Sequence, residues 1–258
     1  MANLQGVTNA LSSPAATPDG QPTPNTYRAG KFNELYIGSM FPTKHLAALA
    51  GNYYTVAGVA AAGIAVVTSL TALTEASPAM IVENTAPLGG PNVMLDFVRL
   101  QATAIAAAAT DLEFAWKIDN VRNKWGSAGT AFTPANANAG MVSGSVATVH
   151  FGALVVATAQ QSSSFAKTLA SGWLTPVGTA PVCVIGDTYD FRFGALEAPL
   201  PTVISNIASN GAHTFATGLC VPVGPIILTP GTTATLFLWG GATGSAASYA
   251  PIAGWYEY

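Results

Sequence analysis

The sequence predicts an all-β protein, an antiparallel β-sandwich of jelly-roll type with an extended N-terminal arm. Three observations lead to this prediction. Three stretches contain no Asp, Glu, Lys or Arg and together cover about half of the chain: His45–Thr74, Trp125–Ala166 and Ala198–Tyr256. They are rich in small and β-branched residues punctuated by Gly and Pro, a composition typical of strands and turns. Elsewhere, apolar and polar residues alternate in short runs, which is the period of a half-buried strand.

Residues 1–26 form the predicted arm. They combine Ser, Thr, Asn, Gly and Pro with few large apolar side chains, so they lack the material for a core of their own. Two interpretations remain for this arm, a disordered tail or a segment that becomes ordered on a neighbouring subunit. Aromatic residues appear at Tyr27 and Phe32, and we therefore expect one sandwich domain over 27–258. The first residues lack the basic and apolar regions of a secretory signal, so synthesis in a cytoplasm is expected.

The clearest predicted strand is Asp111–Asp119, where Leu112, Phe114, Trp116 and Ile118 alternate with polar residues. Two segments, Lys44–Ala50 and Ser163–Ala170, could form one or two helical turns, but both lack caps. Eight or more strands at this spacing favour a sandwich or jelly roll. The other predicted strands are Ala79–Glu83, Asn92–Ile105, Val146–Thr158, Val182–Ile185, Thr188–Phe193, Pro225–Leu228, Thr233–Trp239 and Gly254–Tyr258.

Composition and motifs argue against several classes of function. A net charge of −3 and a pI near 5.5 give no basic footprint for nucleic acid. Neither a nucleophile elbow nor a phosphate-binding loop is present. Thr55–Thr74 has the length of a membrane span, but it is mostly Ala, Gly and Thr without flanking basic clusters. We therefore expect no enzyme activity, no cofactor, no nucleic acid and no membrane span.

The histidines and cysteines give no metal pattern. His45, His150 and His213 are scattered, and His150 is interpreted as a histidine of a sheet face or interface. Cys183 and Cys220 are far apart, so a four-thiolate zinc site is excluded for this chain alone. A single disulfide and two buried thiols both remain open for this pair.

Two pairs of carboxylates are close in sequence. Asp111 and Glu113 share the polar face of one predicted strand and are interpreted as solvated positions. Asp187 and Asp190 could serve as the acid and base of a glycosidase, or Asp187 could bind calcium with loop carbonyls. We rank a hydrolase lowest among the hypotheses.

Five residues are candidate contacts to a partner. Lys117, Arg122, Lys124 and Trp125 lie in the chain's densest basic segment, which is either a loop that binds an acidic surface or a polar hairpin end. Trp173 stands next to Gly in another predicted loop. Trp125 and Trp173 are also the candidates for stacking on sugar rings, whereas Trp116 and Trp239 lie in apolar strand patterns and are predicted to belong to the core.

Several segments in this order resemble virion structural proteins of tailed bacteriophages, in overall style rather than through one diagnostic motif. The resemblance covers about residues 32–258 and rests on Pro78–Asn84, Asn92–Leu100, Trp116–Arg122, Thr133–Asn138, Val221–Gly231, Leu236–Trp239 and Gly254–Tyr258.

The resemblance implies a non-enzymatic subunit of the virion, with a capsid decoration or cement protein as the first hypothesis. Its implied partners are the major capsid protein, other virion proteins and copies of itself, with a trimer favoured. The alternative is a fibre or a receptor- or glycan-binding module.

Overall fold

The computed structural model describes the chain in two compact units, Met1–Ala47 and Ala48–Tyr258. In the first unit, β1 (Tyr27–Ala29) and β2 (Leu35–Ile37) pair antiparallel. The predicted arm, 1–26, lies outside the described residues. The residues that the structure describes are 27–29, 35–37, 43–58, 63–66, 72–104, 112–141, 144–157, 163, 165–174, 185–194, 218–240 and 247–258.

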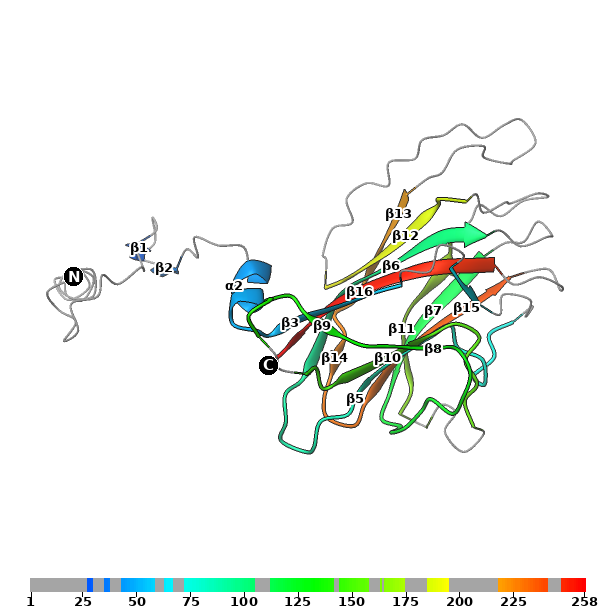
Figure 1. Cartoon of the computed structure of the whole chain (residues 1–258), viewed down its shortest axis with the longest axis horizontal. Helices are drawn as coiled ribbons and strands as arrows, with labels where there is room; N and C mark the ends of the chain where they lie inside the picture. The colour runs from blue at the N-terminus through cyan, green and yellow to red at the C-terminus, as the bar shows by residue number, and fades with distance from the viewer. Residues whose placement is uncertain are drawn as a thin grey trace, which may run out of the picture. The chain divides into compact units, whose positions relative to one another are not determined.

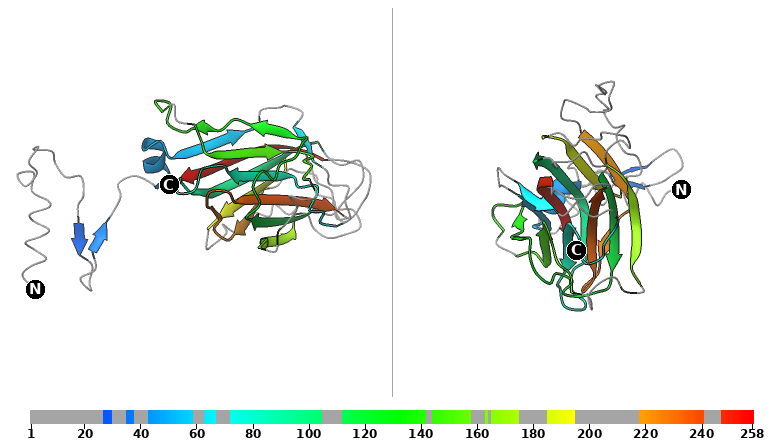
Figure 2. Two further views of the ribbon diagram at one scale, coloured as in Figure 1. Left: turned by 90° about the horizontal axis from the view of Figure 1, so that it is seen from below. Right: turned by 90° about the vertical axis from the view of Figure 1, so that its right-hand side faces the viewer.

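The second unit contains two mostly antiparallel sheets packed face to face, which confirms the predicted β-sandwich (Figures 1 and 2). Sheet 1 has the strand order β11-β7-β15-β5-β10-β8. Its strands are β5 (Met80–Asn84), β7 (Leu112–Asp119), β8 (Thr130–Phe132), β10 (Ala147–Phe151), β11 (Lys167–Trp173) and β15 (Thr233–Gly240).

Sheet 2 has the order β13-β12-β6-β16-β3-β9, with β14 paired to β6 and β4 paired to β16. Its strands are β3 (Tyr53–Ala57), β4 (Ile64–Val66), β6 (Val93–Ala104), β9 (Ala135–Asn136), β12 (Thr188–Phe193), β13 (Gly218–Val223), β14 (Ile227–Leu228) and β16 (Ala247–Glu257).

The central strands have jelly-roll topology. In chain order, the eight strands are β3, β5, β6, β7, β11, β12, β15 and β16. Sheet 2 places the first, eighth, third and sixth side by side, and sheet 1 places the second, seventh, fourth and fifth side by side. All neighbouring pairs within these two sets are antiparallel. This arrangement is the double-sheet jelly roll that closes a sandwich core.

The core lies between the sheets and follows the alternation read from the sequence. On β7, Leu112, Phe114 and Trp116 are buried in the main apolar cluster, so the intervening side chains point to the opposite, outer face of sheet 1. Trp116 is fully buried and its ring lies 5.7 Å from that of Phe191 on β12 in sheet 2. The aromatic contact joins the two sheets across the core.

Some predicted elements differ from the structure. Helix α2 (Thr43–Leu49) confirms the helical segment near Lys44–Ala50. The helical turns predicted for Ser163–Ala170 are wrong, because Lys167–Trp173 instead forms β11 and pairs with β7. The strand predicted for Val146–Thr158 stops at Phe151, since Gly152 has a φ of 125° and turns the chain. Residues 182–184 of another predicted strand lie outside the described residues.

The stretch Thr55–Thr74 contains strands where it is described. Its first residues belong to β3, and Ile64–Val66 forms β4. Both strands pair with β16, the C-terminal strand. Within the described part of the chain, no helix has the length and apolar content to cross a bilayer.

Candidate binding surfaces

The predicted basic loop does not present its three cations together. Lys124 is 1% exposed, and its Nζ lies 3.2 Å from Asp119 Oδ2 inside the chain. The prediction that Lys124 contacts a partner is therefore wrong, because its charge is already paired in the interior. The sequence pattern placed Lys124 next to Trp125 and Gly126 in a loop, and it could not show that this loop folds back over sheet 1.

Asp119 is the centre of this buried polar cluster. It ends β7 on the outer face of sheet 1 and accepts hydrogen bonds from the Ser163 backbone N–H at 2.9 Å and from the Ser163 hydroxyl. Burial alone would raise the pKa of Asp119, but the hydrogen bonds from Ser163 and the charge of Lys124 outweigh it and lower the pKa. The Asp119 carboxylate therefore joins Lys124 and Ser163 to the end of β7 as an anion.

The other two cations have different surroundings. Lys117 pairs with Glu75 and its Nζ lies 5.7 Å from the centre of the Phe237 ring. Arg122 is exposed and its guanidinium lies against Gly231, where an added Cβ would come within 2.2 Å of Nε. Of the three predicted basic contacts, Arg122 alone combines exposure with a charge that no described ion pair neutralises.

Trp125 stacks on a buried histidine. Its ring lies 4.1 Å from that of His150 with an interplanar angle of 13°, and its Nε1 donates to the Ala128 carbonyl at 3.0 Å. Trp125 is still 39% exposed, whereas His150 is 9% exposed. Burial lowers the pKa of His150, so the imidazole beneath Trp125 is held neutral. This geometry fits the predicted sheet-face role of His150 and leaves one ring face of Trp125 for a partner.

Trp173 is at the end of β11, the edge strand of sheet 1, and is 47% exposed. Glu113 on β7 lies directly opposite it, and Trp239 on β15 lies directly opposite Glu113 on the other side. The prediction that Trp239 belongs to the core is wrong. Leu236 and Leu238 fill the core positions of β15, so the strand period turns Trp239 to the outer face, where it is half-buried. We call these three residues the tryptophan row.

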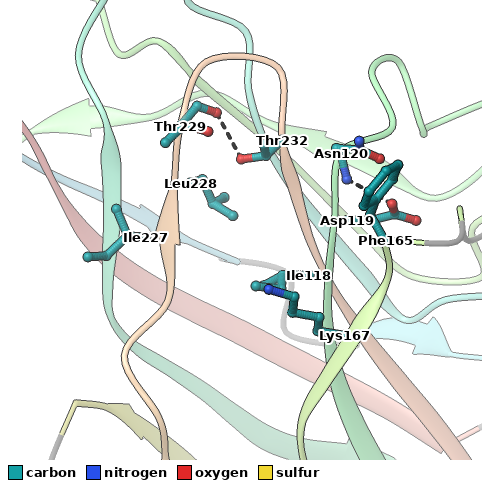
Figure 3. Close-up of a pocket in the computed structure, with 9 residues that line it drawn as sticks. All are labelled: Ile118, Asp119, Asn120, Phe165, Lys167, Ile227, Leu228, Thr229 and Thr232. Carbon is teal, nitrogen blue, oxygen red and sulfur yellow. Dashed lines mark hydrogen bonds between the residues drawn. The ribbon is translucent and has the colours of Figure 1, made fainter.

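An apolar pocket of about 340 Å³ opens at the opposite end of β7 and β11 (Figure 3). Ile227 and Leu228 of β14 form one side, and Ile118, Phe165 and Lys167 form the other. Phe165 and Ile227 are 69% and 53% exposed. Its remaining lining residues are Asp119, Asn120, Thr229 and Thr232. Sequence patterns did not indicate this pocket, because it joins strand ends of the two sheets.

Buried Asn84 fixes the β14 side of this pocket. Its Nδ2 donates to the carbonyls of Leu228 at 2.8 Å and Pro91 at 2.9 Å, and its Oδ1 accepts from the Ala86 N–H at 3.0 Å. The side chain is fully buried, so loss of these bonds would leave backbone groups without partners. Asn84, the last residue of β5 in sheet 1, therefore also links this strand to β14 of sheet 2.

The two carboxylates considered for hydrolysis have different surroundings. Asp190 lies on the outer face of sheet 2, where its Oδ2 is 3.0 Å from Arg99 and 2.6 Å from Arg192. Asp187 is buried at the turn before β12. Cys220, opposite Asp190 on β13, is a free, half-buried thiol whose pKa is raised chiefly by burial. The two guanidinium groups give Asp190 a structural ion-pair role.

Within the described residues, no group of three or more His, Cys, Asp or Glu side chains is placed to hold a metal ion. His45 is exposed on α2. Asp111, Cys183 and His213 lie outside the described residues. Comparisons with protein-family models, with curated proteins and with solved structures found no match to this chain.

Proposed function

We propose that this chain is a non-enzymatic structural subunit of a tailed-bacteriophage particle. The first hypothesis within this class is a decoration or cement subunit that stabilises the head through contacts between subunits. The proposal rests on the resemblance of the sequence to virion structural proteins and on the surface that the fold leaves exposed. Its partners would be the major capsid protein or other virion proteins together with copies of this chain, with a trimer favoured.

The observation that carries the proposal is the pair Phe165 and Ile227 at the mouth of the apolar pocket. Soluble monomers seldom leave large apolar side chains gathered at a concave site without a partner. Covering them removes apolar surface from water at about 25 cal/mol per Å². An apolar side chain of an adjacent subunit would fit this pocket, and the small charge content of the chain leaves few ions to desolvate at such a contact.

The charged groups support the same proposal. Lys117, Lys124 and Arg99 are paired with carboxylates within the chain. An interface that covers Phe165 and Ile227 at the pocket mouth would depend mainly on apolar contact, so it would persist at high ionic strength. Raising salt to about 1 M shortens the Debye length to about 3 Å and would dissolve an interface held by exposed ion pairs.

Light scattering on the size-separated protein tests the proposal at low and high salt. We expect an oligomer at both salt concentrations, and we expect Phe165→Ser/Ile227→Ser to shift the protein toward monomer. Leu88→Ser is the matched control, since Leu88 is 85% exposed but lies outside the pocket. A monomer at both salt concentrations, or an oligomer that dissociates at high salt, would contradict the proposal.

A further inference from the structure

The tryptophan row is a partly exposed aromatic site with a carboxylate at its centre. Trp173, Glu113 and Trp239 occupy three adjacent strands at one register. Strands β11, β7 and β15 lie side by side in Figure 1. With neighbouring strands about 4.8 Å apart, the Cα atoms of the two tryptophans are separated by about 10 Å.

All three side chains lie on the solvent face of sheet 1. Phe114 and Leu238, the neighbours of Glu113 and Trp239, belong to the core cluster, as does Leu174, which follows Trp173. Since successive residues of a strand point to opposite faces, the three members of the row point away from the core. The carboxylate of Glu113 has no hydrogen bond or ion pair with the described residues.

The next position along these strands is filled with small or buried groups. Ser171, Ala115 and Phe237 lie opposite one another in the same order across β11, β7 and β15. Ala115 and Phe237 are each 1% exposed. Lys117 lies over the Phe237 ring, so this neighbouring position is already covered on β15, and a ligand would contact the tryptophan row itself.

We propose that the tryptophan row binds a neutral oligosaccharide of at least two pyranose rings. The apolar C–H faces of sugar rings pack on indole rings, and the separation of the two tryptophans suits two linked rings. The carboxylate between them accepts hydrogen bonds from sugar hydroxyl groups, and charge-assisted bonds of this type are the stronger ones. Sugars that carry a carboxylate would be repelled by Glu113, which sets the chemical class.

This inference goes beyond the structural role proposed above and does not depend on it. The apolar pocket and the tryptophan row lie at opposite ends of β7 and β11, since Ile118 and Lys167 line the pocket whereas Glu113 and Trp173 belong to the row. A subunit could use the first site for assembly and present the second to a glycan. Loss of one function would leave the other measurable.

The test is binding of the full-length protein to an array of immobilised glycans that includes neutral hexose and N-acetylhexosamine oligomers and uronic acid oligomers. Any neutral oligomer that binds is then titrated by calorimetry against Trp173→Ala, Glu113→Gln and Tyr258→Ala. Tyr258→Ala is the matched control, because Tyr258 is a similarly exposed aromatic residue that packs on Tyr256 of β16 in the other sheet. Circular dichroism verifies that each variant is folded.

We expect neutral oligomers to bind and uronic acid oligomers not to bind. Trp173→Ala should weaken binding by about tenfold, as expected for loss of one aromatic contact with its buried area. Glu113→Gln, which keeps the shape of the side chain, should weaken it several-fold, and Tyr258→Ala should leave it unchanged. The absence of any neutral ligand on the array, or equal affinities of Trp173→Ala and the unaltered protein, would overturn the proposal.

Discussion

Replacement of Lys124 tests the buried polar cluster on the outer face of sheet 1. The side chains of Lys124 and Asp119 are both 1% exposed and are 3.2 Å apart. Lys124→Ala removes the cation and leaves the Asp119 carboxylate buried with the bonds from Ser163 as its main support. Removing one member of a buried ion pair costs about 3–5 kcal/mol. For a chain of this size, that loss lowers the melting temperature by roughly 6–20 °C.

Urea unfolding followed by circular dichroism measures the loss for Lys124→Ala. The control is Arg122→Ala, two residues away and exposed, which should change the free energy of unfolding by less than about 0.5 kcal/mol. Asp119→Asn/Lys124→Met removes both charges and should be more stable than Lys124→Ala, because no buried ion is left alone. A loss below about 1 kcal/mol for Lys124→Ala would refute the assignment of Lys124 to the interior.

Two further predictions concern pH. Burial raises the pKa of Glu83 despite the bond from the Asn123 N–H at 2.6 Å, so its favourable contribution is present in acid and is lost as pH rises through the folded-state pKa. The free energy of unfolding of Glu83→Gln should therefore increase relative to that of the unaltered protein as pH rises from about 4 to 7. A difference between the two free energies that does not vary with pH would refute the raised pKa of Glu83. Burial lowers the pKa of His150, so the stability that depends on its neutral form is lost as pH falls below about 6.5. The melting temperature of His150→Phe should depend less on pH between about 5 and 7 than that of the unaltered protein. Equal pH dependence of the two melting temperatures would contradict the assignment of His150 as a buried, neutral imidazole.

Local alternation in the sequence predicted the sandwich well. On β7, apolar residues at every second position were enough to identify both the strand and its inner face. The same rule failed for Trp239 because the segment Thr233–Trp239 is buried on both faces up to Leu238. Phe237 is 1% exposed on the outer face, where the ammonium of Lys117, paired with Glu75, lies over its ring. Coverage by a distant segment cannot be read from the strand's own residues.

The candidate sites depended on pairing between distant segments. Trp173 was a candidate from its sequence context, but its neighbours Glu113 and Trp239 follow from strand register, which is not visible in local composition. Lys124 was misplaced for the same reason, since Asp119 and Ser163 meet only after β7 and β11 have paired. The Ser163–Ala170 segment has small and polar residues that suit a turn of helix, yet β7 offers its backbone groups a ladder of hydrogen bonds.

The most direct test of the proposed virion role is intact-protein mass spectrometry of phage particles purified by density gradient from cultures that express this chain. The proposal predicts that the chain co-purifies with the particles in fixed stoichiometry to the major capsid protein. It should remain bound after a wash at about 1 M salt, where exposed ion pairs are screened. Recovery of the chain only in the particle-free fraction would contradict a structural role in the virion.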